Sequence, residues 1–172
     1  MKRAVLFIVM LVALFCGCDN ASDISARFVL PIKITAVADG SNAEFTAYIQ
    51  ENESKITFAE GHTLSGTVLR FSDNGNTAEI GTTLKREIKS GVFPAQEALI
   101  NLSKRLAKND KKGVVIKNTV LYTIDETEIM VYYDKNSGSV TRIETEEGGK
   151  HFGFTVVSLE PYEEQSNGDY TP

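Results

Sequence analysis

The sequence is poor in several residue types that usually mark a binding or redox site. Its 172 residues include no tryptophan, two histidines and two cysteines. Both cysteines, Cys16 and Cys18, lie within the first 18 residues. The rest of the chain therefore has no cysteine for a disulfide, and a structural zinc site, which needs four Cys or His ligands, is excluded.

A surplus of positive charge is also absent. Lysine and arginine number 18 against 23 aspartates and glutamates, which gives a net charge of −5 at pH 7. A nucleic-acid binder needs cations to neutralise phosphates, so we expect no nucleic-acid partner. The length and the 42% hydrophobic content are typical of a single globular domain.

The first residues have the pattern of an export signal. Lys2 and Arg3 precede the uncharged run 4–15, which is shorter than the roughly 20 apolar residues of a transmembrane helix. The following stretch, Leu-Phe-Cys-Gly-Cys over 14–18, resembles the lipobox of bacterial lipoproteins. That resemblance implies cleavage after Gly17 and a diacylglycerol on Cys18. The alternatives are lipidation of Cys16, which follows a bulky phenylalanine, and an ordinary secreted protein.

These features divide the chain into four parts. We expect a lipoprotein signal peptide over 1–17, a lipidated N-terminus and tether over 18–27, a β domain over 28–160 and a disordered acidic tail over 161–172. Loss of Lys2 and Arg3 leaves 16 basic residues against 23 acidic ones, so the mature chain is more acidic still. The expected location is the extracytoplasmic face of the cell membrane, with the lipid as the membrane contact.

Alternating apolar residues dominate the mature chain and predict strands. Pro31 and Lys33 fall on the face opposite the apolar residues of the first strand, which favours an edge position for it. Within the strand expected over 77–84, we expect Ala78, Ile80 and Leu84 to point inward. The strands are expected over 28–36, 43–50, 55–59, 67–72, 77–84, 114–124, 128–134, 139–145 and 151–159.

One segment changes to a helical period. Residues 94–108 carry apolar side chains three and four positions apart, Pro94 suits a first turn, and basic residues gather near the end. Short links between the strands predict antiparallel pairing. We therefore expect a mainly β (α+β) fold: a strongly curved antiparallel sheet, or half-open barrel, of about nine strands wrapped around one amphipathic helix.

This plan behind a lipobox resembles the LolA-like fold of periplasmic lipoprotein carriers. The stretches 28–36, 63–68 and 130–144 look like a group of uncharacterised lipoproteins from clostridia-type bacteria. The shared motifs are strands and turns, so the resemblance implies a fold and leaves the activity open.

No catalytic constellation is visible in the sequence. Serine-hydrolase, phosphate-loop and zinc-protease motifs are absent, so we expect no enzyme activity and no cofactor or metal. His62 and His151 are interpreted as solvated residues. The pattern Asp134-x-Asn136-x-Gly138 resembles half of a calcium loop, but the twelfth position is Thr145 instead of glutamate, so a hairpin turn explains it better.

Aromatic residues at inward positions of the strands suggest one further site. A single helix leaves part of a wide concave face uncovered, and an apolar cavity for a lipid-like ligand follows as a hypothesis. The residues expected to line it are Phe45, Phe58, Phe71, Tyr133 and Phe154.

Two functions remain open at this point. The first is a non-catalytic module that docks an envelope protein or assembly, and the second is a carrier of a hydrophobic ligand in the concave face. A plugged concave face favours the first function, and an open apolar mouth favours the second.

Overall fold

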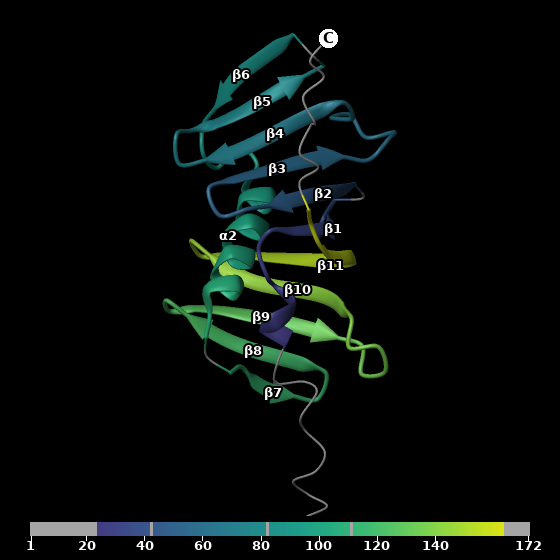
Figure 1. The fold of residues 1–172 in the computed structure, drawn as a ribbon, viewed down its shortest axis with the longest axis vertical. Coiled ribbons are helices and arrows are strands. Elements are labelled where there is room, and N and C mark those ends of the chain that lie inside the picture. Colours follow the sequence, from purple (N-terminus) through teal and green to yellow (C-terminus); the bar gives the residue numbers. More distant parts are fainter. Residues whose placement is uncertain (1–23, 42, 82, 111, 164–172) are drawn as a thin grey trace, which may run out of the picture.

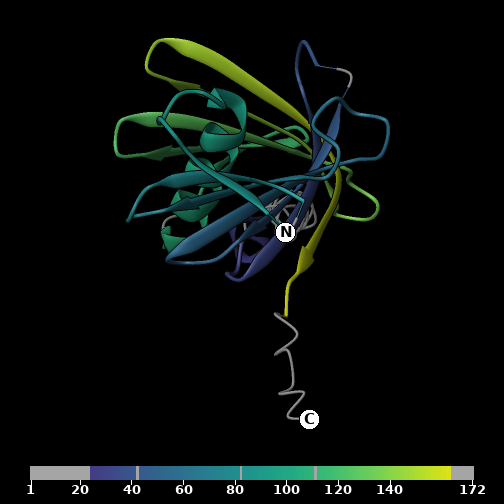
Figure 2. The same cartoon turned by 90° about the horizontal axis from the view of Figure 1, so that it is seen from above.

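A computed structural model describes residues 24–41, 43–81, 83–110 and 112–163. The expected signal peptide with its cleavage site at Gly17, the expected lipid attachment at Cys18 and most of the expected acidic tail lie outside these residues. The described chain forms one antiparallel sheet of eleven strands in the order β6-β5-β4-β3-β2-β1-β11-β10-β9-β8-β7, with one α-helix, α2 (Pro94–Lys108). The sheet is curved and unclosed, as Figures 1 and 2 show, and the mainly β prediction is confirmed.

Eleven strands take the place of the nine expected. They range from three residues in β7 to twelve in β11, and all consecutive strands except β6 and β7 pair with each other. The two halves of the sheet are joined by the pairing of β1 with β11. The strands are β1 (Ile32–Ala38), β2 (Glu44–Ile49), β3 (Glu53–Phe58), β4 (Thr67–Ser72), β5 (Asn76–Ile80), β6 (Leu84–Ile88), β7 (Val114–Ile116), β8 (Thr119–Ile124), β9 (Thr127–Tyr133), β10 (Val140–Glu147) and β11 (Lys150–Pro161).

The connection between β6 and β7 shapes the molecule. These two strands are the outer edges of the sheet, and α2 lies between them in sequence. The helix therefore crosses the concave side of the sheet while the chain travels from one edge to the other (Figure 1). Seen from above, the sheet bends around the helix (Figure 2). We call the strands β5 and β6 the β6 end, and the strands β7, β8 and β9 the β7 end.

The core lies between α2 and the concave face. The helix begins and ends where its sequence pattern predicts, and it buries one stripe against the sheet. On the sheet, the buried side chains form rows that run across the strands, because paired residues of an antiparallel sheet share a face. One such row runs through Ile34, Ala47, Ile56 and Leu69, and each of these side chains is fully buried.

Three details of the expected strand plan were wrong. The strand that contains Ile32 is central instead of an edge, because β1 pairs with both β2 and β11. Pro31 precedes it, so the missing N–H removes no bond from the sheet. The strands expected over 77–84 and 114–124 are each two strands, separated by turns at Gly81, with φ +60°, and at Lys117, with φ +59°.

The domain includes residues that were expected to be tether or tail. A short 3-10 helix, η1 (Ile24–Arg27), buries Ile24 to 2% exposure, and the amide N–H of Ser25 donates to the hydroxyl of Tyr122 at 2.9 Å. At the other terminus, the N–H of Tyr162 donates to the carbonyl of Pro31, and its ring packs edge-on against Tyr48.

Candidate functional site

The aromatic residues expected to line a ligand cavity are mostly part of the core. Phe45 and Phe154 are buried to 1% and 0% exposure, and Phe71 and Tyr133 are nearly as buried. Phe58 is half-buried beside Phe45 on the neighbouring strand. Phe71 lines one small hollow next to α2, and Tyr133 lines a different hollow at the β7 end. Phe45, Phe71, Tyr133 and Phe154 therefore belong to one buried core cluster, and Phe58 packs against it.

The concave face is covered over its middle strands and open at the β6 end. Ile80 and Leu84 pair with each other, and Ile80 also pairs with Thr67, whose side chain faces the core. Both apolar side chains therefore point to the concave side, as the sequence predicts. They remain 52% and 44% exposed, because α2 packs against β2 and β11 and leaves the outermost strands uncovered. We call Ile80 and Leu84 the uncovered concave patch.

The opposite end of the sheet has its exposed apolar residues on the convex face. In β7, Val115 pairs with the buried Val120, so Val114 and Ile116 point outward and are 62% and 56% exposed. The three-residue strand has no partner on its outer side among the described residues.

A group of cations lies beside this edge. Lys117 and Lys135 line one hollow of about 500 Å³, between the β7–β8 turn and the β9–β10 turn. The hydroxyl of Tyr133 fixes the first turn by donating to the carbonyl of Lys117 at 3.2 Å. The Arg27 guanidinium covers the second turn, with Nη2 2.9 Å from the position that a Cβ on Gly138 would occupy. We call Arg27, Lys117 and Lys135 the anchor corner.

The one carboxylate of this hollow is already engaged. Asp134 Oδ1 accepts hydrogen bonds from the backbone N–H of Asn136 and Ser137 and from the Ser137 hydroxyl. The bonds from Ser137 are the main cause that holds the pKa of Asp134 below its usual value. Gly138 has a φ of +66° and closes the turn. The Asp-x-Asn-x-Gly pattern is thus a hairpin turn, as the sequence interpretation favoured.

A second charged cluster lies on the convex face of the central strands. Arg142 on β10 donates to both carboxylate oxygens of Asp39 and to Glu144 at 2.6 Å. These bonds raise the pKa of Arg142, and the Arg142 bond lowers the pKa of Asp39. Gly153 leaves room for the bridge, because a Cβ there would collide with the Asp39 carboxylate and the Arg142 guanidinium. Each charge has an opposite partner, so the cluster joins β1 to β10 across β11.

A hollow of about 600 Å³ lies beside the C-terminal half of α2. Its charged lining consists of Lys104, Arg105 and Lys108 together with two aspartates, Asp110 and Asp125. The cations already have partners: Arg105 donates to Thr127 and lies near Glu147, and Lys108 pairs with Glu51. Lys104 donates to the Glu51 carbonyl at 2.9 Å, and burial lowers its pKa. Basic residues at this position also balance the negative end of the helix dipole.

The histidines are placed as surface residues. His62 stacks on Phe58 with ring centroids 5.0 Å apart, and its Nδ1 accepts the N–H of Leu64. His151 is exposed at the start of β11, opposite Glu146. Over the described ranges, no group of three or more His, Cys, Asp or Glu side chains is arranged to hold a metal ion. No helix in that part of the chain has the length and apolar character to cross a membrane.

Sequence reasoning found the inward direction of Ile80 and Leu84 and missed the anchor corner. Lys117 and Lys135 are 18 positions apart, and only the pairing of β8 with β9 brings their turns together. The sequence nevertheless contained one indication of it, because three lysines, at 111, 112 and 117, lie close together in a chain with net negative charge.

Comparison with known proteins gives remote structural similarity alone. No protein-family model and no curated protein matches the chain. A LolA superfamily protein from Nitrosomonas europaea is similar with a TM-score of 0.38 and 10% identity, covering 85% of this chain and 95% of that protein. A hypothetical protein from Chlamydia trachomatis has a TM-score of 0.37 and 8% identity, covering 83% and 93%. Likeness at this level says nothing of what the chain binds.

Proposed function

We propose that this protein is a lipid-anchored, non-catalytic interaction module of a bacterial cell envelope, held at the membrane through Cys18. A protein partner binds it at the uncovered concave patch. The observation that carries this proposal is the exposure of Ile80 and Leu84 on the concave face, whose central strands are buried beneath α2. An apolar segment of the partner, laid beside the helix, would continue the layer that α2 begins.

The charges around the patch support a specific partner over random association. Arg86 lies between Leu84 and Ile88 on the same face of β6, and Lys85 and Glu87 line the other face. Charged side chains on an edge strand discourage pairing with unrelated strands. A partner must therefore cover the apolar residues from the concave side instead of adding a strand at the edge.

Photo-crosslinking in the bacterial envelope tests the proposal. A photoreactive amino acid is placed in the full chain at Leu84 and, as the matched control, at Glu87 on the opposite face of the same strand. We expect a crosslinked band of discrete protein mass from position 84 and none from position 87. Equal bands at both positions, or none at either, would contradict a partner on the concave side.

Binding of a hydrophobic ligand is the second candidate, and the same exposed patch favours it. Native mass spectrometry of the protein, extracted gently from membranes and compared before and after organic extraction, separates the two. A removable mass beyond that of the acylated chain, matching a lipid, supports the carrier function. A single unchanged mass, with no lipid taken up on titration, removes it.

A further inference from the structure

The chain enters the domain at the β7 end of the sheet. Ile24 is buried there, and the Ser25 amide N–H donates to the Tyr122 hydroxyl on β8. Only six residue steps separate Cys18 from Ile24, and a fully extended chain covers at most about 20 Å in that number. With the lipid on Cys18 that the proposed function includes, the β7 end is held within that distance of the bilayer, and the β6 end lies at the far end of the sheet (Figure 1).

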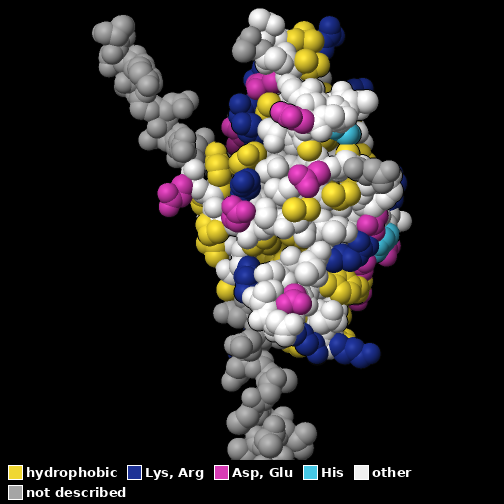
Figure 3. Space-filling view, turned by 90° about the vertical axis from the view of Figure 1, so that its right-hand side faces the viewer, with side chains coloured by type: hydrophobic (Ala, Val, Ile, Leu, Met, Phe, Trp, Pro, Cys, Tyr) yellow, Lys and Arg dark blue, Asp and Glu magenta, His cyan; other side chains and the backbone are white. Residues whose placement is uncertain are grey.

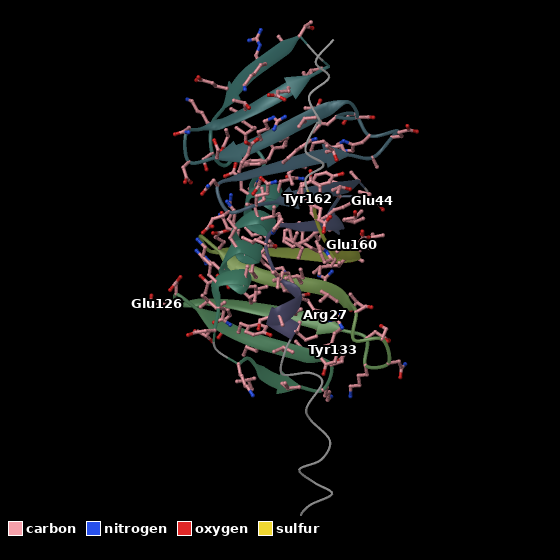
Figure 4. The ribbon with its side chains drawn as sticks, viewed as in Figure 1. Arg27, Glu44, Glu126, Tyr133, Glu160 and Tyr162 are labelled. Atoms are coloured by element: carbon pink, nitrogen blue, oxygen red, sulfur yellow. The ribbon has the colours of Figure 1, made fainter. Side chains whose placement is uncertain are left out.

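Cations without an acidic partner lie at this end. The side chains of Arg27, Lys117 and Lys135 form no ion pair with any described residue, and the nearby Asp134 carboxylate is occupied by turn hydrogen bonds. In the view of Figure 3, Lys and Arg side chains lie at the lower end of the molecule, and others are spread along its length. Figure 4 shows Arg27 near Tyr133, with Glu126 in the β8–β9 turn at the other end of these strands.

Apolar side chains accompany these cations. Val114 and Ile116 project from the convex face of β7 and are more than half exposed. The neighbouring strand continues this strip, because Val114 is paired with Leu121, which is partly buried. Exposed aliphatic residues beside unpaired lysine and arginine are the composition of surfaces that rest in the headgroup region of a membrane. Anionic headgroups attract such cations over about a Debye length.

We propose that the anchor corner and the outer face of β7 bind the anionic surface of the bilayer that holds the lipid. This contact orients the sheet, with β7 toward the membrane and the uncovered concave patch on β6 away from it, where an envelope protein can reach it. The proposal rests on the proposed lipid anchor and adds an electrostatic contact to it. A second copy fits less well, because two β7 ends would bring like charges together.

The test measures which end of the full, acylated chain lies at the lipid. Expected maturation removes Cys16 and acylates Cys18, so one introduced cysteine provides a single thiol for a fluorescent dye. Asn136→Cys reports on the β7 end, and Glu87→Cys reports on the β6 end. The chains are incorporated into vesicles of phosphatidylcholine with about 30% phosphatidylglycerol, and quenching by a nitroxide-bearing lipid is recorded.

We expect at least about threefold stronger quenching at position 136 than at position 87, falling in pure phosphatidylcholine or in high salt to the smaller difference that the lipid tether alone produces. Lys117→Glu with Lys135→Glu should reduce the difference to that same level. Arg86→Glu with Lys89→Glu changes the net charge equally at the β6 end and should leave the difference intact. Circular dichroism of each variant confirms that it is folded.

Four results would overturn the inference. Equal quenching at both positions, or quenching at 136 that ignores the charge reversal, rejects the electrostatic contact while the anchor stands. Failure of the chain to float with the vesicles rejects the anchor itself, and flotation separates this result from the first. Crosslinking of an acidic protein from a photoreactive residue at 116, without quenching at 136, assigns the corner to a protein instead.

Discussion

The two ends of the sheet protect their free edges in different ways. β6 carries Lys85, Arg86 and Glu87 in its five residues, and such charges prevent accidental strand pairing. β7 consists of Val114, Val115 and Ile116 and carries no charge. An apolar edge of this kind is a risk for aggregation unless something covers it. β7 therefore needs a cover that β6 does not need. It lies next to the point where the chain enters the domain, and the proposed bilayer contact would supply that cover.

The same two ends also differ in how far the core extends. Around β1, β2 and β11 the concave face is closed by α2, whereas on β5 and β6 Ala78 and Ile88 are only partly buried and Ile80 and Leu84 are exposed. One face of one sheet therefore changes from protein interior to exposed surface along its length. The predictions below test that difference and the difference between the edges.

The largest effect is expected from alanine substitutions along the concave face. Leu69→Ala removes a fully buried side chain, and we expect a loss of about 2–5 kcal/mol in the free energy of unfolding. Leu84→Ala, two strands away on the same face, should cost less than about 1 kcal/mol, because the side chain is already half in water. Urea unfolding of both variants measures this, and equal losses would mean that the β6 end is covered in the folded monomer.

Alanine substitutions of one glycine at each end of the sheet should differ in their cost to stability, because the β7 end is closely packed around its glycine and the β6 end is not. A Cβ at Gly113 would overlap a methyl group of the buried Val120 and approach the Tyr122 ring to 2.9 Å. We expect Gly113→Ala to cost about 1–3 kcal/mol and to loosen β7. Gly81→Ala meets no atom within 4 Å and pays only for its positive φ, about 1 kcal/mol. Hydrogen exchange should show faster opening of β7 and β8 in Gly113→Ala alone. A larger loss of stability in Gly81→Ala than in Gly113→Ala would refute the packing assigned to Gly113.

The β8–β9 turn offers a stabilising change at the β7 end. Asp125 and Glu126 have φ values of +50° and +64°, which side chains other than glycine and asparagine adopt at a cost. Glu126→Gly should raise the free energy of unfolding by about 0.5–1 kcal/mol, since glycine is preferred at the second position of such a turn. Glu128→Gly, placed in the following strand, is the destabilising control. Thermal unfolding of both variants reports the sign.

The smallest effect is expected from the ion pairs of Arg142 on the convex face, whose contribution to stability is lost at low pH. The hydrogen bond from Arg142 lowers the pKa of Asp39. Burial raises the pKa of Glu144, but bonds from Arg142 and Tyr132 outweigh it, so this pKa also falls below its usual value. Lowered carboxylate pKa values stabilise the folded state at neutral pH, and that contribution is lost as the pH falls below about 4.

A single variant measures this contribution. We expect Asp39→Asn to lower the melting temperature at pH 7 and to flatten its decline between pH 5 and pH 2.5. The effect should be less than about 1 kcal/mol, because the Asp39 side chain is 47% exposed. Glu128→Gln, an exposed carboxylate outside the ion pairs, serves as the control. An unchanged pH profile in Asp39→Asn would show that the ion pair contributes nothing measurable.

Much of the fold could be predicted because its signals are local. The helix over 94–108 has a clear period, and its boundaries agree with the sequence expectation. Alternation likewise gave the buried face of β1, β2 and β4. The turns at Gly81 and Lys117 were missed because alternation continues across them, so two hairpins were interpreted as two long strands.

The candidate site could be predicted less well because it depends on distant neighbours. Whether the inward-facing Ile80 is buried or exposed depends on how far α2 extends over the sheet. The sequence pattern of residues 76–88 does not contain that information. Phe154 and Phe45 were expected beside a ligand, but the helix and the strands fill the space around them.

By itself, the sequence determined the strand faces and the helix with its limits, since these depend on residues close together in the chain. The pattern over 14–18, on which the proposed lipidation of Cys18 rests, is local in the same way. Only the tertiary structure decided that β1 is central, that Ile80 and Leu84 stay exposed on the concave face, and that Arg27, Lys117 and Lys135 lie at the neighbouring β7–β8 and β9–β10 turns. The physical reason is that burial and net local charge are properties of neighbours in space, and pairing of the strands sets those neighbours.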